Sequence, residues 1–473
     1  MKLFNAIAQQ EKYDEQAICT TFKNENFIKH LAEGKKRLYQ LIAKNLESFH
    51  YSTDTELKRF IHQAEIFYHK RLYKPCANIL AKAKHIAYQQ EKYLQLIEII
   101  EWEQELEAAA HADLQKSKND KKDIMKEKEV VLEKFVNEQK YKGIRYTLLK
   151  HHRLNDIARS EQEVKAYQKI INNDLCSRED KALSFNAKYD FYYIHSVFSY
   201  ATGDLTGNYR YQKKLTDLFN KHPEQCLEQP KKYISSLANY SYICYLVKKH
   251  GECWTLIKKI REFPTRSIQI QILIFRTSYE RELGLYLRTG EYHKGIQLIE
   301  AIEKGMQRYK DKIPNSYIVT FYFNMASIYF SMQDYSNSLV WLNKMINNAA
   351  LKNSRADLHC FAHIINLIVH FELGNLDLLE YIVKSTYRFL YKRNRLYKLE
   401  SCILNFIRKK VPQIITNAKQ VIAFHELKTE LEEITRDPFE KKALEYFDFI
   451  SWVESKIEDR PFAEIVQEKA GKG

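Results

Sequence analysis

Glycine and proline are scarce in this chain, which has 12 Gly and 8 Pro among its 473 residues. Sheet proteins need many tight turns and a doubly wound α/β fold needs glycine-rich loops, whereas long helices need neither. Apolar residues also recur at intervals of three and four along most of the chain, without convincing alternation of period two. The sequence therefore predicts an all-α fold. Because a single core seldom grows beyond about 250–300 residues, several domains or one elongated stack of helices is expected.

The charge is basic overall, with 75 Lys and Arg against 60 Asp and Glu and a formal net charge of +15. Such a balance attracts acidic peptides and nucleic acid through its overall field. The eight cysteines form no CxxC pair and several lie among apolar residues, as reduced, buried thiols do. No signal-peptide pattern and no uncharged run of about 18 residues is found, so a cytoplasmic protein without a membrane span is expected.

Changes in pattern along the chain predict five segments. Residues 116–123 are purely polar and lack an apolar face, which favours a solvated joint at this point. The predicted segments are an N-terminal helical region with one repeat hairpin at 1–111, a polar joint at 112–124, divergent helical repeats at 125–230, regular repeats at 231–394, and a C-terminal helical section and tail at 395–473.

Similar units recur within this pattern, and the clearest one surrounds Ala326. It consists of Tyr322, Ala326 and Tyr329, the turn Gln333-Asp334-Tyr335, and then Ser338, Leu342 and Met345. Related units are predicted at the turns Arg71-Leu72-Tyr73, Gly251-Glu252-Cys253, Gly290-Glu291-Tyr292 and Gly374-Asn375-Leu376, with a weaker one at Gly203-Asp204-Leu205. A helix hairpin cannot bury its own apolar face, so units of this kind are expected to stack on one another.

These units resemble the tetratricopeptide-repeat (TPR) family, in divergent form. The regular units advance from turn to turn by 39, 43 and 41 residues, counted from Cys253 to Tyr292, Tyr335 and Leu376, whereas the standard repeat has about 34. Leu283 and Leu367 also stand where the family has a small residue. The resemblance implies a right-handed, TPR-like α-solenoid of stacked antiparallel helix hairpins. An irregular helical bundle is the alternative.

In the TPR family, the first helix of each hairpin lines a concave groove that binds a partner. Carried over by register, the groove residues expected to bind a partner are Tyr245, Lys248, Lys249, Arg288, Phe323 and Phe330. Their mixture of aromatic and basic side chains suits an extended or helical peptide with apolar and acidic character. The very apolar set from Phe361 to Phe371 is instead expected to lie under a neighbouring helix.

No residues in the sequence indicate catalysis, a cofactor or a metal. Gly290 and Gly295 have the outer spacing of a phosphate-binding loop, but Lys and Ser or Thr do not follow them. His359 and His363 could share one helix face as a zinc pair does, yet no local carboxylate completes a shell, and core or surface histidines are favoured. A non-enzymatic protein is predicted. The enzyme alternative would require residues that meet only in the folded chain.

Two basic stretches keep nucleic acid as an alternative partner. One interleaves tyrosines with basic residues, which can hold single strands by stacking and phosphate contacts; it contains Lys384, Tyr387, Arg388, Tyr391, Lys392, Arg393, Arg395, Tyr397 and Lys398. The other would be a helix-turn-helix with Lys29, Lys35, Lys36 and Arg37 on its third helix. The leading hypothesis is a protein- or peptide-binding scaffold, and the alternative is a bacterial peptide-responsive or nucleic-acid-binding regulator.

Overall fold

The computed structural model describes residues 2–49, 52–113, 124–155, 157–158, 160–414 and 416–471. The chain divides into two compact units, residues 1–137 and 138–473, with the division inside helix α7 (Ile124–Asn155). Residues 114–123, most of the predicted polar joint, lie outside the described residues.

The described residues form helices and no strands, so the prediction of an all-α chain is confirmed. In the first unit the helices before α7 are α1 (Lys2–Ala8), α2 (Glu15–Thr21), α3 (Leu31–Phe49), α4 (Thr53–His69), α5 (Tyr73–Gln89) and α6 (Tyr93–Asp113). Helices α4 to α6 pack on one another in order and bury the core of this unit, which includes Leu57, Ala64, Cys76 and Leu80.

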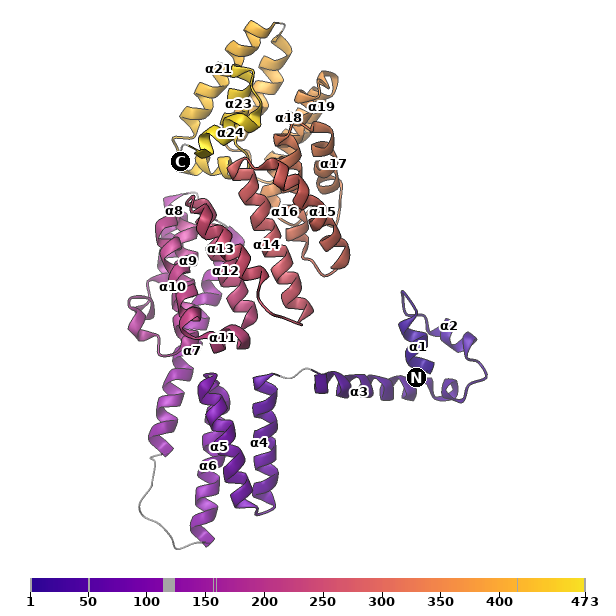
Figure 1. The fold of residues 1–473 in the computed structure, drawn as a ribbon, viewed down its shortest axis with the longest axis vertical. Coiled ribbons are helices and arrows are strands. Elements are labelled where there is room, and N and C mark those ends of the chain that lie inside the picture. The colour runs from indigo at the N-terminus through magenta and orange to yellow at the C-terminus, as the bar shows by residue number, and fades with distance from the viewer. Residues whose placement is uncertain are drawn as a thin grey trace. The chain divides into compact units, whose positions relative to one another are not determined.

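The second unit contains five consecutive helix hairpins (Figure 1). Their first helices are α9 (Phe185–Thr202), α12 (Pro230–Leu246), α14 (Ile268–Thr289), α16 (Asn315–Ser331) and α18 (Ala356–Glu372). Their second helices are α10 (Leu205–Lys221), α13 (His250–Arg261), α15 (Tyr292–Arg308), α17 (Tyr335–Ile346) and α19 (Leu376–Tyr391). Each hairpin packs against the next one in the chain, which is the neighbour-to-neighbour packing expected of a helical repeat.

The remaining helices of the second unit flank these hairpins. They are α8 (Glu161–Ile171), α11 (Pro223–Glu228), α20 (Lys398–Asn405), α21 (Asn417–Ile434), α22 (Pro438–Lys441), α23 (Phe449–Glu458) and α24 (Phe462–Gly471). No described helix is long and apolar enough to cross a membrane.

One backbone turn closes all five hairpins and also the α4/α5 hairpin. In each, one residue has positive φ, and the next amide donates a hydrogen bond to the carbonyl five residues earlier, which satisfies the end of the first helix. The positive-φ residues are Arg71, Gly203, Lys248, Gly290, Gln333 and Gly374. From Gly203 to Gly374 they advance by 45, 42, 43 and 41 residues.

This turn corrects the predicted register of the α12/α13 hairpin. The sequence predicted the turn at Gly251-Glu252-Cys253, but the positive-φ residue is Lys248 and Gly251 lies inside α13. Gly251-Glu252 has the same two residues as the true turn at Gly290-Glu291, so the sequence placed the turn three residues too late. The residue with positive φ is a lysine, which gives no such signal. The turns predicted at Arg71, Gly203, Gly290, Gln333 and Gly374 are confirmed.

A repeated contact joins the two helices in several of these hairpins, among them α16/α17, α12/α13 and α4/α5. Seven residues before the turn residue the first helix exposes a backbone carbonyl, and five residues after the turn the second helix donates to it. Ser338 Oγ bonds Ala326 O at 2.9 Å, Cys253 Sγ bonds Ser241 O at 3.3 Å and Cys76 Sγ bonds Ala64 O at 3.4 Å. The α14/α15 hairpin has a different pair of residues at these two positions. Leu283 stands seven residues before the turn residue, and Gly295 stands five residues after it. Ile328 of α16, the first helix of the next hairpin, occupies the space beside Gly295.

The shared turn predicts opposite stability changes at two positions. Gln333 holds φ at +60°, which is strained for a residue with a Cβ, so Gln333→Gly should raise the free energy of unfolding by about 0.5–1 kcal/mol. Gly374 has φ of +71° and open space around a Cβ, so Gly374→Ala should lower the same quantity by about 1 kcal/mol through backbone strain alone. Urea unfolding measures both changes, and a destabilising Gln333→Gly would contradict this assignment of strain.

The C-terminal helices cover the last hairpin. Phe361 stacks on Tyr446 with ring centres 4.3 Å apart, and Phe371 contacts Phe424 of α21 and Trp452 of α23. The prediction that the set from Phe361 to Phe371 lies under neighbouring structure is confirmed. The same packing brings a C-terminal segment against helices that lie more than 100 residues earlier in the chain.

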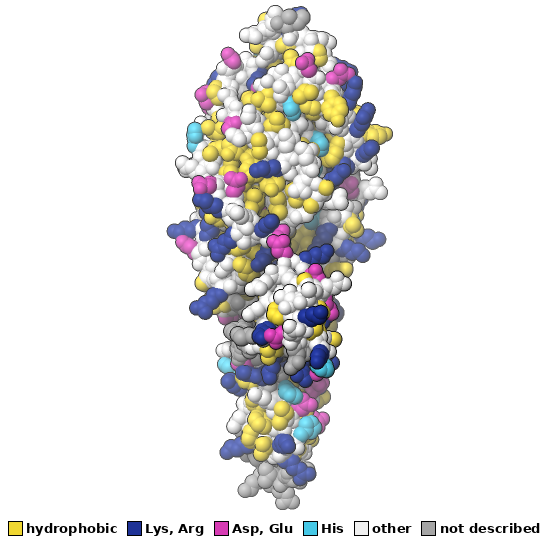
Figure 2. Space-filling view, turned by 90° about the vertical axis from the view of Figure 1, so that its right-hand side faces the viewer, with side chains coloured by type: hydrophobic (Ala, Val, Ile, Leu, Met, Phe, Trp, Pro, Cys, Tyr) yellow, Lys and Arg dark blue, Asp and Glu magenta, His cyan; other side chains and the backbone are white. Residues whose placement is uncertain are grey.

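The surface carries both signs of charge. On the face drawn in Figure 2, Lys and Arg side chains are scattered among acidic and hydrophobic ones rather than gathered into one patch. The excess of basic residues is thus spread over this face, and a local site must be identified from particular side chains.

Candidate functional site

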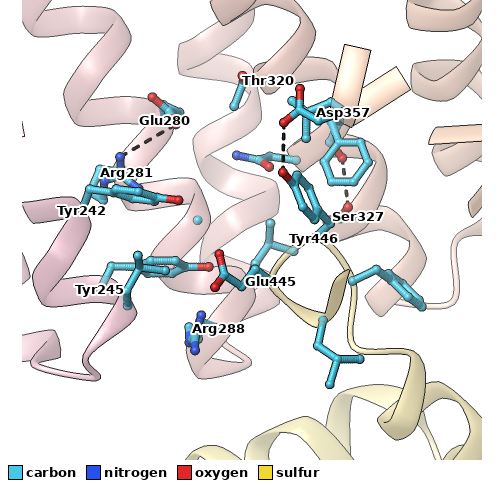
Figure 3. Close-up of a pocket in the computed structure, with 18 of the residues that line it drawn as sticks. Tyr242, Tyr245, Glu280, Arg281, Arg288, Thr320, Ser327, Asp357, Glu445 and Tyr446 are labelled. Atoms are coloured by element: carbon cyan, nitrogen blue, oxygen red, sulfur yellow. Dashed lines mark hydrogen bonds and ion pairs between the residues drawn. The ribbon is translucent and has the colours of Figure 1, made fainter. Parts of the chain in front are cut away.

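The first helices of successive hairpins surround a cavity of about 1030 Å³ in the second unit. Helices α12, α14, α16 and α18 supply half of the residues that line it, and residues 444–448 together with α24 line another side. Figure 3 shows side chains from these elements pointing into the shared space. The cavity is therefore bounded by the first helices of consecutive hairpins and by the C-terminal segment.

Two arginines of α14 rest on two tyrosines of α12. The Arg281 guanidinium lies 4.5 Å from the ring centre of Tyr242, and the Arg288 guanidinium lies 4.9 Å from the ring centre of Tyr245. The two tyrosine rings are nearly parallel, at an interplanar angle of 15°. Stacking on an aromatic face fixes a guanidinium while leaving its N–H groups directed outward around the plane. We call Tyr242, Tyr245, Arg281 and Arg288 the tyrosine–arginine cluster.

The donors of this cluster are largely unused. The Arg288 guanidinium makes no hydrogen bond with the part of the chain that the structure describes, and the buried Nε of Arg281 has no acceptor there. The nearest acid to Arg281 is Glu280, whose Oε1 lies 3.9 Å from Nη2, too far for a hydrogen bond. Nε2 of His250, another lining residue, is also buried without a partner among the described residues. Buried polar groups are normally satisfied, so this corner of the cavity is suited to an anionic acceptor.

Glu445 projects from the C-terminal segment toward this corner. Its carboxylate is directed toward Arg288 and Tyr245 (Figure 3) and remains exposed to the solvent of the cavity. Loss of hydration among the surrounding protein raises the pKa of Glu445, although the positive charges of Arg288 and Lys442 oppose this rise. The positive charges of Arg288 and Lys442 therefore do not fully offset the loss of hydration of the Glu445 carboxylate.

The opposite end of the cavity contains a satisfied ion pair. Arg355 donates from Nε and Nη2 to Asp357, and from Nη1 to Thr320 Oγ1 at 3.3 Å. The hydroxyl of Tyr446 also donates to Asp357 Oδ2, at 3.1 Å. Burial favours the neutral acid, but these hydrogen bonds and the charge of Arg355 lower the pKa of Asp357 overall. The Tyr446 bond joins the C-terminal segment to α18, and both carboxylate oxygens of Asp357 accept hydrogen bonds.

Four of the six predicted groove residues line the cavity: Tyr245, Lys248, Arg288 and Phe323. Lys249 does not line it, because its ammonium lies 4.1 Å from the ring centre of Tyr209 and donates to the hydroxyl of that residue. Phe330 does not line it either: its side chain is fully buried against Tyr335, Phe447 and Phe462. Whether the four lining residues bind a partner stays a prediction.

Sequence reasoning did not identify Tyr242, Arg281 or Glu445 as site residues. Tyr242 was missed because the register of α12 was shifted by three, and Tyr242 takes the position that had been given to Tyr245. Arg281 adjoins Glu280 on α14, and both residues line the cavity. No local signal identifies Glu445, since its position depends on how the C-terminal helices pack.

The histidines weighed as metal ligands have other surroundings. A ring nitrogen of His359 lies 3.0 Å from the Leu351 carbonyl oxygen, and the ring of His363 lies 4.0 Å from that of Phe389. No group of three or more potential metal ligands is found among the described residues. Burial lowers the pKa of His363 to about 4, so this ring is neutral at pH 7.

The basic aromatic stretch lies partly on α19, where Tyr387 and Tyr391 stack on each other and are exposed. Tyr381 on the same helix is 75% exposed. The three N-terminal helices proposed as a helix-turn-helix are separated by short segments and are followed by α4. Within the basic aromatic stretch, Arg395 lines the cavity, whereas Lys384 and Arg388 do not.

The cavity and its tyrosine–arginine cluster are thus defined by the geometry of the chain itself. No protein-family model matches the chain, and a search of curated proteins finds no similar sequence.

Proposed function

We propose that this chain is a non-enzymatic, peptide-binding protein that uses the inner groove of a right-handed, TPR-like solenoid. The observation that carries the proposal is the cavity of about 1030 Å³ lined by the first helices of consecutive hairpins. Stacked helix hairpins form extended concave surfaces, and such surfaces bind segments of other proteins. The regular turns and the repeated contacts between paired helices support the TPR-like assignment.

The chemistry of the cavity supports a peptide of acidic and apolar character. Its described lining contains seven Arg or Lys and four Asp or Glu, so a negatively charged ligand is favoured. The lining also includes Tyr242, Tyr245 and Tyr317, which supply large, rigid contact areas at a small cost in side-chain entropy. The volume reaches the upper end of the range of about 300–1,000 Å³ for small-molecule pockets, enough for several peptide residues.

Site-specific photo-crosslinking in the native cells tests this proposal. A photoreactive phenylalanine derivative replaces Tyr245 in the groove or, as a matched control, Tyr381 on the outer face of α19. The expected result is one or a few discrete crosslinked products from position 245 and none of these from position 381. Products that form only at position 381, or equally at both positions, would contradict binding in the groove.

A second candidate function, nucleic-acid binding by a regulator, is supported by the exposed tyrosines of α19. Tyr387 and Tyr391 form a stacked, solvent-exposed pair next to Arg388 and Lys392, a composition that can hold single-stranded nucleic acid. Titration with short single- and double-stranded DNA at 50 mM and about 200 mM salt tests this candidate. Micromolar affinity with a steep salt dependence would favour it, and no binding at low salt would exclude it.

A further inference from the structure

We propose that the tyrosine–arginine cluster is a carboxylate-binding subsite for an acidic side chain of the bound peptide, and that Glu445 is its internal competitor. This inference rests on the proposed peptide-binding function and specifies the class of ligand. It concerns one corner of the cavity, where α12, α14 and residues 444–448 meet.

The guanidinium N–H groups of Arg281 and Arg288 are available to a ligand. Arg288 and Arg281 are fixed against tyrosine rings, yet neither guanidinium donates a hydrogen bond to the described residues. Arg355 in the same cavity is different, because its N–H groups bond Asp357 and Thr320. A guanidinium binds a carboxylate best through two parallel hydrogen bonds, and the α14 arginines retain the donors for this interaction.

The chain itself already places one carboxylate, that of Glu445, next to this cluster. This carboxylate enters the cavity beside Arg288, so the corner has space for a carboxylate (Figure 3), and the charge of Arg288 favours the ionised form although burial raises the pKa of Glu445 overall. Glu445 makes no hydrogen bond with the part of the chain described here, and it retains access to solvent. An incoming carboxylate with better geometry can therefore form bonds to Arg288 that Glu445 leaves unmade. The negative charge of Glu445 opposes this binding.

The spacing of the two arginines predicts the spacing of acidic residues in the bound peptide. Arg281 and Arg288 are seven residues apart on α14, which corresponds to about 10 Å along the helix axis. An extended peptide covers about 10 Å in three residues. We therefore expect acidic residues at positions i and i+3 of the ligand, with the stronger preference for the residue that contacts Arg288, since Glu280 already lies near Arg281.

Selection of a displayed library of random 12-residue peptides tests the proposal. The library is selected on the full chain as wild type, Arg288→Gln and Glu445→Gln. Arg308→Gln is the matched control, because the Arg308 guanidinium also lies over a tyrosine ring, that of Tyr309, but it is on second helix α15 and outside the cavity. Wild type and Arg308→Gln should enrich acidic residues, Glu445→Gln should enrich them more strongly, and Arg288→Gln should lose the enrichment.

One enriched acidic peptide, labelled with a fluorophore, then gives the dissociation constants. We expect Arg288→Gln to weaken binding about tenfold or more and Glu445→Gln to strengthen it about threefold or more. A gain of affinity cannot result from misfolding, so Glu445→Gln keeps the test valid if Arg288→Gln is unstable. Inorganic phosphate is added as a competitor: displacement of the peptide at micromolar phosphate would assign the cluster to phosphate and overturn the carboxylate subsite.

A blocking variant separates failure of the carboxylate subsite from failure of peptide binding in the groove. Peptides whose binding is lost in Asn324→Trp, which fills the groove from α16 without adding charge, but which carry no acidic preference would overturn the subsite and leave the groove proposal standing. Peptides that bind all variants equally, including Asn324→Trp, or a library without any enriched sequence would overturn binding in the groove itself.

Discussion

Replacing Trp452 with alanine is expected to lower the free energy of unfolding of the second unit by about 3–5 kcal/mol. The Trp452 side chain is 1% exposed and packs against Phe371 and Phe424. Its Nε1 donates to Glu372 Oε1 at 2.7 Å, so the substitution leaves a cavity and also removes one hydrogen bond from a buried carboxylate. Urea unfolding followed by far-UV circular dichroism measures the change.

Trp452→Phe separates the two contributions to this loss. The phenylalanine keeps much of the packing against Phe371 and Phe424 but cannot donate to Glu372, which retains Lys456 as a partner. A loss of about 1–2 kcal/mol is expected for this variant. If Trp452→Ala costs less than about 1 kcal/mol, the C-terminal helices do not hold the last hairpin in the way that the packing indicates.

His363 is expected to make the second unit sensitive to acid. Burial lowers the pKa of His363 to about 4, from an ordinary value of 6.5, so the folded chain favours the neutral ring. The stabilisation is complete above pH 6.5, is lost progressively as the pH falls from 6.5 and is gone once the pH has fallen through 4, because the unfolded chain binds the proton at higher pH. The shift corresponds to about 3 kcal/mol at most.

His363→Gln tests this prediction, since glutamine fills much of the same space and does not titrate. Urea unfolding of both proteins at pH 7 and pH 4.5 gives the pH dependence of stability. Wild type should lose up to about 3 kcal/mol more than the variant over this interval. Equal losses in the two proteins would show that His363 is not kept neutral by its contact with Phe389 and the surrounding core.

Much of the fold could be predicted because its causes are local. The shortage of glycine and proline and the spacing of apolar residues depend only on neighbouring residues, and they correctly indicated an all-α chain. Hairpins whose left-handed residue is glycine, at Gly203, Gly290 and Gly374, were located correctly because a turn of this kind selects that residue type. Gln333 and Arg71 were found through the pattern of their flanks.

The site was predicted less completely because its causes are not local. At Lys248 a lysine adopts positive φ, and the nearby Gly251 misplaced the turn, which excluded Tyr242 and placed Lys249 in the groove. Phe330 has the register of a groove residue but is covered by Phe447 and Phe462 from the C-terminal segment. Glu445 reaches the cluster by the same long-range packing, which no repeat pattern within the chain records.

Hydrogen–deuterium exchange tests peptide binding in the groove most directly, with the chain measured alone and bound to an acidic peptide from the display selection. We expect slower exchange in residues 239–248, 280–291 and 316–331, which contain the cavity-lining parts of α12, α14 and α16 and their adjoining turns. Exchange in the second helices α13, α15 and α17 should not change beyond these turns. Slower exchange confined to those second helices, or to residues 2–113, would contradict binding of the peptide in the groove.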